Sequence, residues 1–459
     1  MQQNGYDIKV FNLVKPSSSD GYNPLVHIQS EIDVDVIANT IVKGQKDDKA
    51  TSSADPYWDD MAEVLLKALI YYLIAKRPEE EQNLASCAEL VRAANSNGGD
   101  NLLTELMSEL PYDHPARMNY KSIEIAPEKT YGSILSSLQS KLSKFDSKEI
   151  ADLTSTNTIN FEDIGKRKTA LYVLSSDSHG AYDFILTIFF AQMIQHLYNF
   201  ADDSGGKLPV RTFFVLDEFA NIGKIPDFDK KISTSRSRHI SFSVILQNLD
   251  QLEAVYKESH ETIIGNCDTH VFLGSNSQET VEYFSKALGE KTIVRDSKSI
   301  NRDRDNVKQG SSTSDQVLGR ALMTPDELRR LDPDACIIYE TGLKPIKARK
   351  YYYFKYPISK KAEAVAINHN SIGTMNRGTW RKFNPYNPYV EGAEKRDSKS
   401  LNVQSLDEIF DEPKKDPTPP APKAENEPEF SYDIQKELEA KFDELFGTAE
   451  TQTATKKEN

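Results

Sequence analysis

The stretch Thr212-Phe-Phe-Val-Leu-Asp-Glu-Phe-Ala-Asn221 decides the predicted fold, because four consecutive apolar residues lead directly into two adjacent carboxylates. The run from Phe213 to Leu216 is typical of a fully buried strand in a parallel sheet. Asp217 and Glu218 follow at the carboxyl end of that strand, the edge at which open α/β sheets bind their ligands. A strand that ends in an ordinary Asp-Glu turn has the same local sequence, so this alternative stays open.

A second apolar run, Ile240 to Leu246, ends in the polar residues Gln247 and Asn248. A glutamine at such a strand end can hydrogen-bond both an attacking water and a γ-phosphate oxygen. In the same site Asp217 would hold Mg²⁺ through its water shell, and Glu218 would orient and polarise the attacking water. The two strand ends together therefore indicate a nucleotide-hydrolysing site.

Two arginines precede the second run, in the segment from Ser233 to His239. Arg236 or Arg238, presented at the rim of one subunit, could reach a phosphate held by a neighbouring subunit and act as an arginine finger. A solvated turn with two ordinary surface arginines explains the segment equally well.

Three runs resemble the conjugative coupling proteins of type IV secretion: Phe213 to Gly223, Ser233 to Arg236, and Ile245 to Leu252. The similarity covers roughly Gly5 to Tyr356 and includes three further runs, Asp55 to Trp58, Phe184 to Tyr198, and Gly319 to Leu328. These family members are hexameric DNA-pumping ATPases of the RecA-like class. The resemblance implies a Walker B pair, a sensor glutamine and a trans-acting arginine, which are Asp217 with Glu218, Gln247, and Arg236.

The resemblance also implies ATP and Mg²⁺ as cofactors. It implies relaxase and relaxosome proteins, DNA and components of the secretion channel as partners. The expected assembly is a homohexamer on the cytoplasmic face of the cell membrane, and this chain is interpreted as its soluble part. Two other functions stay open: a non-hydrolysing receptor for relaxosome proteins, and another DNA translocase of the same superfamily.

Two features of the family pattern are missing from the sequence. Coupling proteins begin with membrane-spanning helices and then carry a phosphate-binding loop of the form Gly-x-x-x-x-Gly-Lys-Ser/Thr. The Gly-Lys pairs of this chain begin at Gly165, Gly206 and Gly223, and none is followed by Ser or Thr. The first residues, Gly5 to Leu13, resemble the strand that follows the phosphate loop. We therefore expect the N-terminal third to be absent, through truncation, a mis-called start codon or a split gene, and the chain alone to be inactive.

The charge distribution predicts a folded part and an acidic tail. The formal net charge is −14, and residues 391–459 hold 18 acidic and 10 basic residues, a net of −8 that leaves −6 for residues 1–390. Such a balance is compatible with a DNA-tracking ring, in which a few cations line the channel. Candidates near the site are Lys230, Lys231, Arg236 and Arg238, although a solvated face explains the lysines as well.

The element pattern predicts an α/β fold with a mostly parallel sheet. The resemblance implies that this fold contains a RecA-like, P-loop-type nucleotide-binding domain. Its first part is expected at residues 1–76 and its remainder, with the Walker B pair, at 161–358. The resemblance places a small all-α domain between them, at 77–160. Residues 359–459 are expected to be a linker and a disordered acidic tail with short amphipathic helices.

The individual elements follow from hydrophobic spacing. Strands are predicted at 7–13, 170–174, 213–216, 240–246, 269–274 and 336–340, and helices at 56–75, 85–95, 102–110, 133–145 and 182–198. Asp55 is expected to cap the first of these helices, and Thr324 and Pro325 to open a short one. Residues 295–316 are polar and charged, which predicts a mobile loop or a hairpin.

No apolar run approaches the roughly 18 residues that span a bilayer, so Phe184 to Ile194 is interpreted as a core helix. Three cysteines, Cys87, Cys267 and Cys336, lie far apart and are predicted to be reduced structural thiols.

The tail contains two apolar clusters at helical spacing, within residues 406–410 and 434–446. An amphipathic helix on a flexible tether suits capture in a partner's groove, so recruitment of relaxase or other cargo is our hypothesis. A solubilising tail that docks on its own domain is the alternative.

Overall fold

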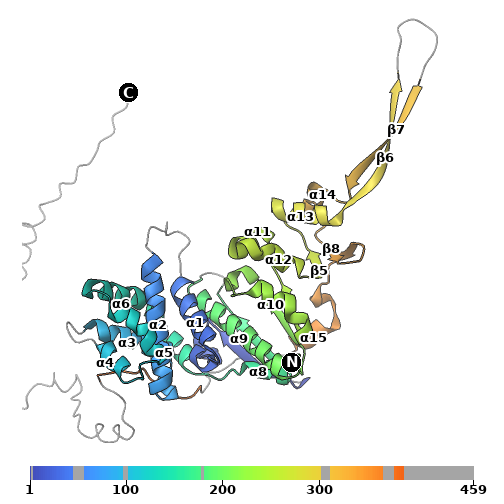
Figure 1. Ribbon diagram of the computed structural model, residues 1–459. Helices are drawn as coiled ribbons and strands as arrows, with labels where there is room; N and C mark the ends of the chain where they lie inside the picture. Colours follow the sequence, from blue (N-terminus) through green and yellow to red (C-terminus); the bar gives the residue numbers. More distant parts are fainter. Residues whose placement is uncertain are drawn as a thin grey trace, which may run out of the picture. The chain divides into compact units, whose positions relative to one another are not determined.

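The computed structural model describes residues 1, 4–44, 56–96, 102–176, 180–300, 311–364 and 377–386, and within residues 295–300 and 311–316 only the backbone. All of them belong to one unit, Met1–Val390 (Figure 1). Asp55 and both apolar clusters of the acidic tail lie outside the described residues.

Two parallel strand pairs confirm the predicted α/β class. β1 (Asp7–Asn12) pairs with β2 (Thr169–Leu174), and β3 (Thr212–Leu216) pairs with β4 (Ile240–Val244). A third sheet joins β5 (Thr269–Phe272), β8 (Ala335–Glu340) and β9 (Ile346–Arg349). Its strand pairs are antiparallel, whereas we expected a mostly parallel sheet. The short connection between β8 and β9 requires this direction, because parallel neighbours need a crossover.

Strand β3 is buried on one face only. Phe214 and Leu216 are 6% and 4% exposed, whereas Phe213 and Val215 are 68% and 70% exposed. The prediction of a fully buried strand is therefore wrong for the described chain. Successive side chains of a strand point to opposite faces, and no described segment covers the face that carries Phe213 and Val215.

A layer of helices precedes β2. It consists of α1 (Glu31–Lys43), α2 (Pro56–Lys76), α3 (Leu84–Ser96), α4 (Leu102–Ser108), α5 (Pro115–Glu124), α6 (Glu128–Leu142), α7 (Lys148–Ser155) and α8 (Phe161–Lys166). Four of them, α2, α3, α4 and α6, were predicted. Helix α2 packs on α1, α5 and α6, and one hydrophobic core continues from these helices to the sheet. The proposed domain boundaries after residues 76, 160 and 358 stay predictions.

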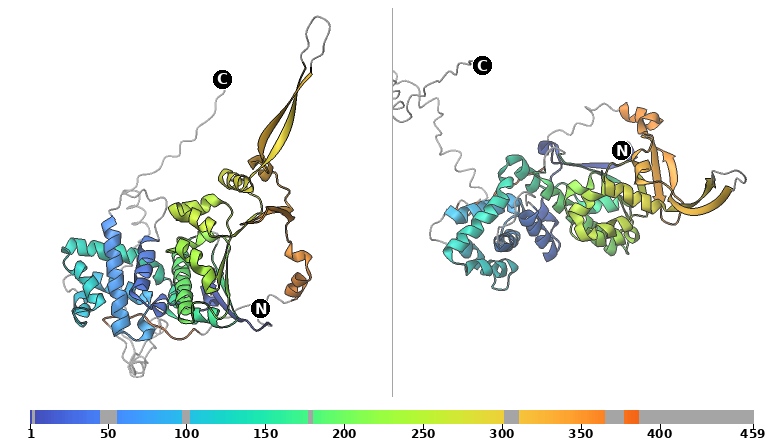
Figure 2. Two further views of the ribbon diagram at one scale, coloured as in Figure 1. Left: turned by 45° about the vertical axis from the view of Figure 1, so that its right-hand side comes forward. Right: turned by 90° about the horizontal axis from the view of Figure 1, so that it is seen from above.

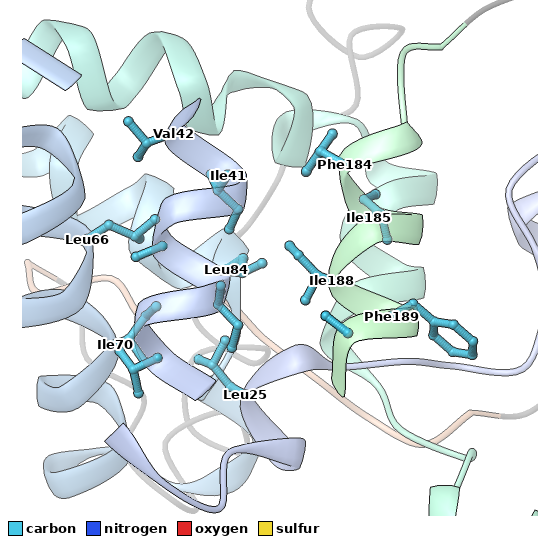
Figure 3. Close-up of a cluster of buried hydrophobic side chains, with 14 of the residues drawn as sticks. Leu25, Ile41, Val42, Leu66, Ile70, Leu84, Phe184, Ile185, Ile188 and Phe189 are labelled. Atoms are coloured by element: carbon cyan, nitrogen blue, oxygen red, sulfur yellow. The ribbon is translucent and has the colours of Figure 1, made fainter. Parts of the chain in front are cut away.

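Helix α9 (Asp183–Asp203) runs through this core. Its Phe189 is fully buried and stacks on Phe11 of β1, with 4.4 Å between the ring centroids. Figure 3 shows Phe184 and Ile188 of α9 on the side that faces Ile41 of α1. By length and composition α9 could cross a membrane, contrary to our expectation that no run approaches that length, but 83% of its apolar window is buried inside the fold. Its burial confirms the predicted core helix.

A mobile loop or a hairpin was predicted for residues 295–316, and the described strands form the hairpin. β6 (Glu290–Ile300) and β7 (Ser311–Ala321) pair antiparallel from Glu290 opposite Ala321 to Ile300 opposite Ser311, as a two-stranded ribbon (Figure 2). The predicted short helix is α14 (Pro325–Arg329), which Thr324 caps in a capping box with Glu327. The remaining helices are α10 (Phe228–Thr234), α11 (Leu249–Tyr256), α12 (His260–Gly265), α13 (Gln278–Leu288) and α15 (Pro357–Glu363).

A buried histidine lies in the core beside α9. His27 Nε2 hydrogen-bonds Asn157 Oδ1 at 3.0 Å, its backbone oxygen contacts His196 Nε2 at 2.7 Å, and its ring stacks on Phe161. Burial, and secondarily the neighbouring His196, lower the pKa of His27 from 6.5 to about 4. The folded protein therefore holds this side chain neutral at a pH where the unfolded chain protonates it.

This pKa predicts that the fold loses stability in mild acid. Between pH 6.5 and about 4 the unfolded state binds a proton at His27 that the folded state does not bind. The stabilisation of the fold by the neutral His27 is therefore present above pH 6.5 and is lost as the pH falls toward 4. We expect His27 to lower the free energy of unfolding by about 2 kcal/mol between pH 7 and pH 5. Urea unfolding followed by tryptophan fluorescence measures this, and a His27→Phe variant should show a flatter pH dependence. Equal pH slopes for both proteins would contradict the assignment.

Candidate nucleotide site

The ends of β3 and β4 bring two of the predicted site residues together. The pairing continues beyond the strands, because Ile245 N donates to Leu216 O at 3.0 Å and Phe219 N donates to Ile245 O at 3.1 Å. This register places Gln247 beside the acid pair, and Gln247 Nε2 donates to Glu218 Oε1 at 2.9 Å. Two of the residues predicted to form the site are thus in direct contact, and their roles stay predictions.

The turn that carries the acids has an unusual backbone. Glu218 has φ 53°, in the left-handed region that non-glycine residues rarely adopt. Such conformations persist where the surroundings fix them, and they cluster at functional sites. Here the next residue, Phe219, is fully buried and packs on Phe228 and Tyr256, with ring centroids 4.8 Å and 5.5 Å away. The aromatic packing holds the turn in place.

Gly223 closes the same turn against α9. It has φ 83°, and a Cβ at this position would lie 2.7 Å from Thr187 Oγ1. That hydroxyl donates a hydrogen bond of 2.6 Å to Ile222 O. Only glycine fits here without displacing the contact, so the position of the acid turn is tied to the core helix.

Asp217 is exposed and makes no hydrogen bond or ion pair with the described residues. Those residues also contain no group of three or more His, Cys, Asp or Glu that could hold a metal on their own. A single free carboxylate fits Mg²⁺, which keeps several waters and takes its other oxygens from phosphates. The donors therefore fit the metal and water side of a nucleotide site.

The phosphate-binding part of a nucleotide site needs other donors. The donors that cradle a β-phosphate are backbone amides and a lysine of a glycine-rich loop. No Gly-x-x-x-x-Gly-Lys-Ser/Thr sequence occurs in the 459 residues. The strand ends thus carry donors that suit only the metal and water side of a nucleotide site, and donors of the phosphate-loop kind are not among the described residues.

Sequence reasoning missed the residues that anchor the β4 end. Asn248 Oδ1 accepts a 2.6 Å hydrogen bond from Ser275 Oγ, and Leu249 N donates to Thr280 Oγ1 at 3.0 Å. The backbone N of Gln247 donates to Gln251 Oε1 at 3.2 Å. The contacts with Ser275 and Thr280 connect the Gln247 turn to the start of α13, a proximity that depends on the tertiary fold, whereas the contact with Gln251 is local to α11.

The two candidate arginines differ in their surroundings. Arg238 donates to both carboxylate oxygens of Asp202 at 3.1 Å and 3.2 Å, and its guanidinium lies over the ring of Tyr198. Arg236 is exposed, and its guanidinium makes no hydrogen bond or ion pair with the described residues. Arg238 is therefore engaged with α9, whereas Arg236 remains available, and neither contacts Glu218 or Gln247 within the described chain.

Known proteins resemble this chain in sequence and in fold. A protein TraG of conjugal transfer from Escherichia coli is 26% identical over 397 residues, which are 78% of this chain and 61% of that protein. A VirD4 protein from Rhizobium rhizogenes is 28% identical over 203 residues, 44% of this chain and 30% of that protein. The chain thus spans less than two thirds of the length of either relative.

Among solved structures, the bacterial conjugative coupling protein TrwBdeltaN70, in its trigonal form with sulphate, matches with a TM-score of 0.54. It is 17% identical, over 78% of this chain and 77% of that chain. This likeness confirms the predicted RecA-like fold class.

The family model described as type IV secretory system conjugative DNA transfer matches residues 1–375. This match covers the parallel strands, the acid turn and the helical layer alike. The chain belongs to the family of conjugative DNA-transfer coupling proteins of type IV secretion.

Proposed function

We propose that this chain is part of an ATP-driven motor that recruits relaxase-bound DNA and moves it to the conjugation channel. The observation that carries the proposal is the hydrogen bond between Gln247 and Glu218, beside the unpaired carboxylate of Asp217. The solved relatives support a nucleotide ligand, because TrwB was crystallised with the ATP analogue ADPNP and the GTP analogue GDPNP.

Each strand-end side chain then has a role. Bound ATP with Mg²⁺ supplies a γ-phosphate whose charge the ion neutralises. Asp217 accepts hydrogen bonds from the waters of that ion. Glu218 orients and polarises the attacking water, and Gln247 fixes one oxygen of this carboxylate, which leaves the other free to accept from water. The proposal requires phosphate donors in addition to these residues.

Arg236 acts in trans in this proposal. Its exposed guanidinium, free of contacts to the described residues, can reach a phosphate held by the next subunit of a ring. This role needs an assembled homo-oligomer, for which a hexamer is the family expectation. We place the assembly at the cytoplasmic face of the membrane.

The partners follow from the same proposal. They are DNA, relaxase and relaxosome proteins, and components of the secretion channel. The helical layer and the acidic residues 391–459 are the proposed contact regions for cargo, and a solubilising tail stays the alternative for the latter.

A second function is favoured by one observation. Because the 459 residues contain no phosphate-binding loop of the usual form, the chain could act as a non-hydrolysing receptor for relaxosome proteins. In that case the acid turn contributes only to structure. The two functions make opposite predictions for Glu218.

We expect Glu218→Gln to lower conjugative transfer frequency at least about 100-fold, because general-base catalysis contributes on the order of 10²–10⁴ in rate. The measurement is mating between donor cells that carry the variant gene and recipient cells. Glu258→Gln is a matched control, since Glu258 is an exposed glutamate away from the strand ends. Wild-type transfer with the Glu218 variant present at normal abundance would exclude the hydrolytic role and favour the receptor.

The two arginines give a paired prediction. Arg236→Ala should abolish transfer with little change in stability, because its exposed side chain makes no hydrogen bond or ion pair with a described residue. Arg238→Ala should instead lower the free energy of unfolding by about 1 kcal/mol, since it loses the Asp202 pair and the contact with Tyr198. Urea unfolding and mating assays on both variants separate the effects. A stability loss in Arg236→Ala equal to that in Arg238→Ala would argue for a structural role.

A further inference from the structure

The segment Lys344–Lys361, which we call the basic aromatic strip, concentrates positive charge in an acidic chain. It contains seven basic residues and no Asp or Glu, although the whole chain has a formal net charge of −14. None of the seven forms an ion pair with a described residue, and all except Lys350 are exposed. They are Lys344, Lys347, Arg349, Lys350, Lys355, Lys360 and Lys361.

A run of aromatic residues lies between Lys350 and Lys355, and Tyr356 follows; four of these five rings are exposed to solvent. The exposed fractions are 65% for Tyr351, 69% for Tyr353, 56% for Phe354 and 42% for Tyr356. The rings of Tyr351 and Tyr356 stack at 3.9 Å between centroids. Large aromatic side chains normally bury most of their surface, so four exposed rings within six residues mark a binding surface.

Hydrogen bonds fix the backbone of the strip. β9 pairs with β8, and Lys350 N donates to Asp334 O at 2.7 Å. Tyr352 OH donates to Asp334 Oδ1 at 2.8 Å. Further along, Ser359 is buried and its Oγ donates to Tyr356 O at 2.9 Å. A surface ordered before binding loses less conformational entropy when it meets a ligand.

The cations near the nucleotide site are less available. Lys230 pairs with Asp227 at 2.7 Å, and Arg238 pairs with Asp202. Burial lowers the pKa of Lys231, which opposes a charged contact with DNA. Of the four cations that the sequence suggested for DNA contact, only Arg236 is both exposed and without an ion-pair partner among the described residues.

We propose that the basic aromatic strip binds single-stranded DNA. Proteins that bind single strands combine cations that follow the phosphates with aromatic rings on which unpaired bases stack. A duplex hides the faces of its bases, so it would use the cations but leave the rings unused. An acidic peptide has the same limitation. A contact between two copies of the strip would oppose like charges, which is unfavourable.

This inference rests on the proposed function, which names DNA as the ligand. The experiment that tests it requires no ATP. Fluorescence anisotropy of a labelled 20-nucleotide oligo(dT) is measured with the full 459-residue chain, in parallel with a labelled duplex of equal length. Tyr353→Ala/Phe354→Ala should weaken binding of the single strand at least about fivefold, the lower limit for losing one stacked base. Tyr172→Ala is the matched control, because Tyr172 is also exposed, at 46%, and lies outside the strip and the helical layer.

A charge variant provides a second readout. For single strands each phosphate contact contributes about −0.7 to the slope of log K against log salt. Lys355→Gln/Lys360→Gln should therefore reduce the slope by about 1.4, whereas Lys207→Gln/Lys286→Gln, at exposed positions outside the strip and the helical layer, should leave it unchanged.

Several outcomes would overturn the proposal. These are no saturable binding by the wild-type chain, equal affinities for wild type and the Tyr353→Ala/Phe354→Ala variant, or tighter binding of the duplex. A change of sedimentation mass in that variant, with unchanged DNA affinity, would identify a protein interface instead. Glu218→Gln should bind oligo(dT) as wild type does, so a failed hydrolytic role and a failed strip remain distinguishable.

Discussion

The parallel register of β3 and β4 is the constraint on which the candidate site depends. Because Leu216 lies opposite Val244, and the ladder continues through Ile245, the two chain turns that follow must lie side by side. Glu218 and Gln247 are far apart in the chain, yet this register brings them within 2.9 Å. A shift of one residue would turn every side chain of one strand to the opposite face and separate the pair.

The core supports this register from one side. Phe214 and Leu216 of β3 and Phe219 of the acid turn all belong to the core cluster that contains α9. Thr187 of α9 holds the turn through Ile222 O, which extends the rigidity of the core to the site. The opposite face of β3 is exposed in the described chain, so the described core contacts that hold the acid turn come from the helical side.

Sequence patterns predicted the parts of the fold that depend on local spacing. The apolar runs around residues 213–216 and 240–246 predicted both strands, and the acid pair and Gln247 identified the two strand ends that the fold brings together. The hairpin β6–β7 was only one of two alternatives, since the polar and charged sequence of residues 295–316 carries no alternating apolar signal. The exposure of Phe213 and the anchoring by Ser275 could not be predicted, because both depend on which segments meet in three dimensions.

Cations in this protein fall into two groups that the sequence alone does not separate. Arg238 and Lys230 are satisfied by carboxylates of their own chain, so their charges are largely neutralised before any ligand arrives. Arg236 and the basic aromatic strip keep their charges unpaired within the described residues. Unpaired cations repel one another and do not stabilise a fold, whereas a polyanion releases its counterions when it binds them. The distribution of ion pairs, more than the net charge, therefore indicates which cations are available to bind phosphates.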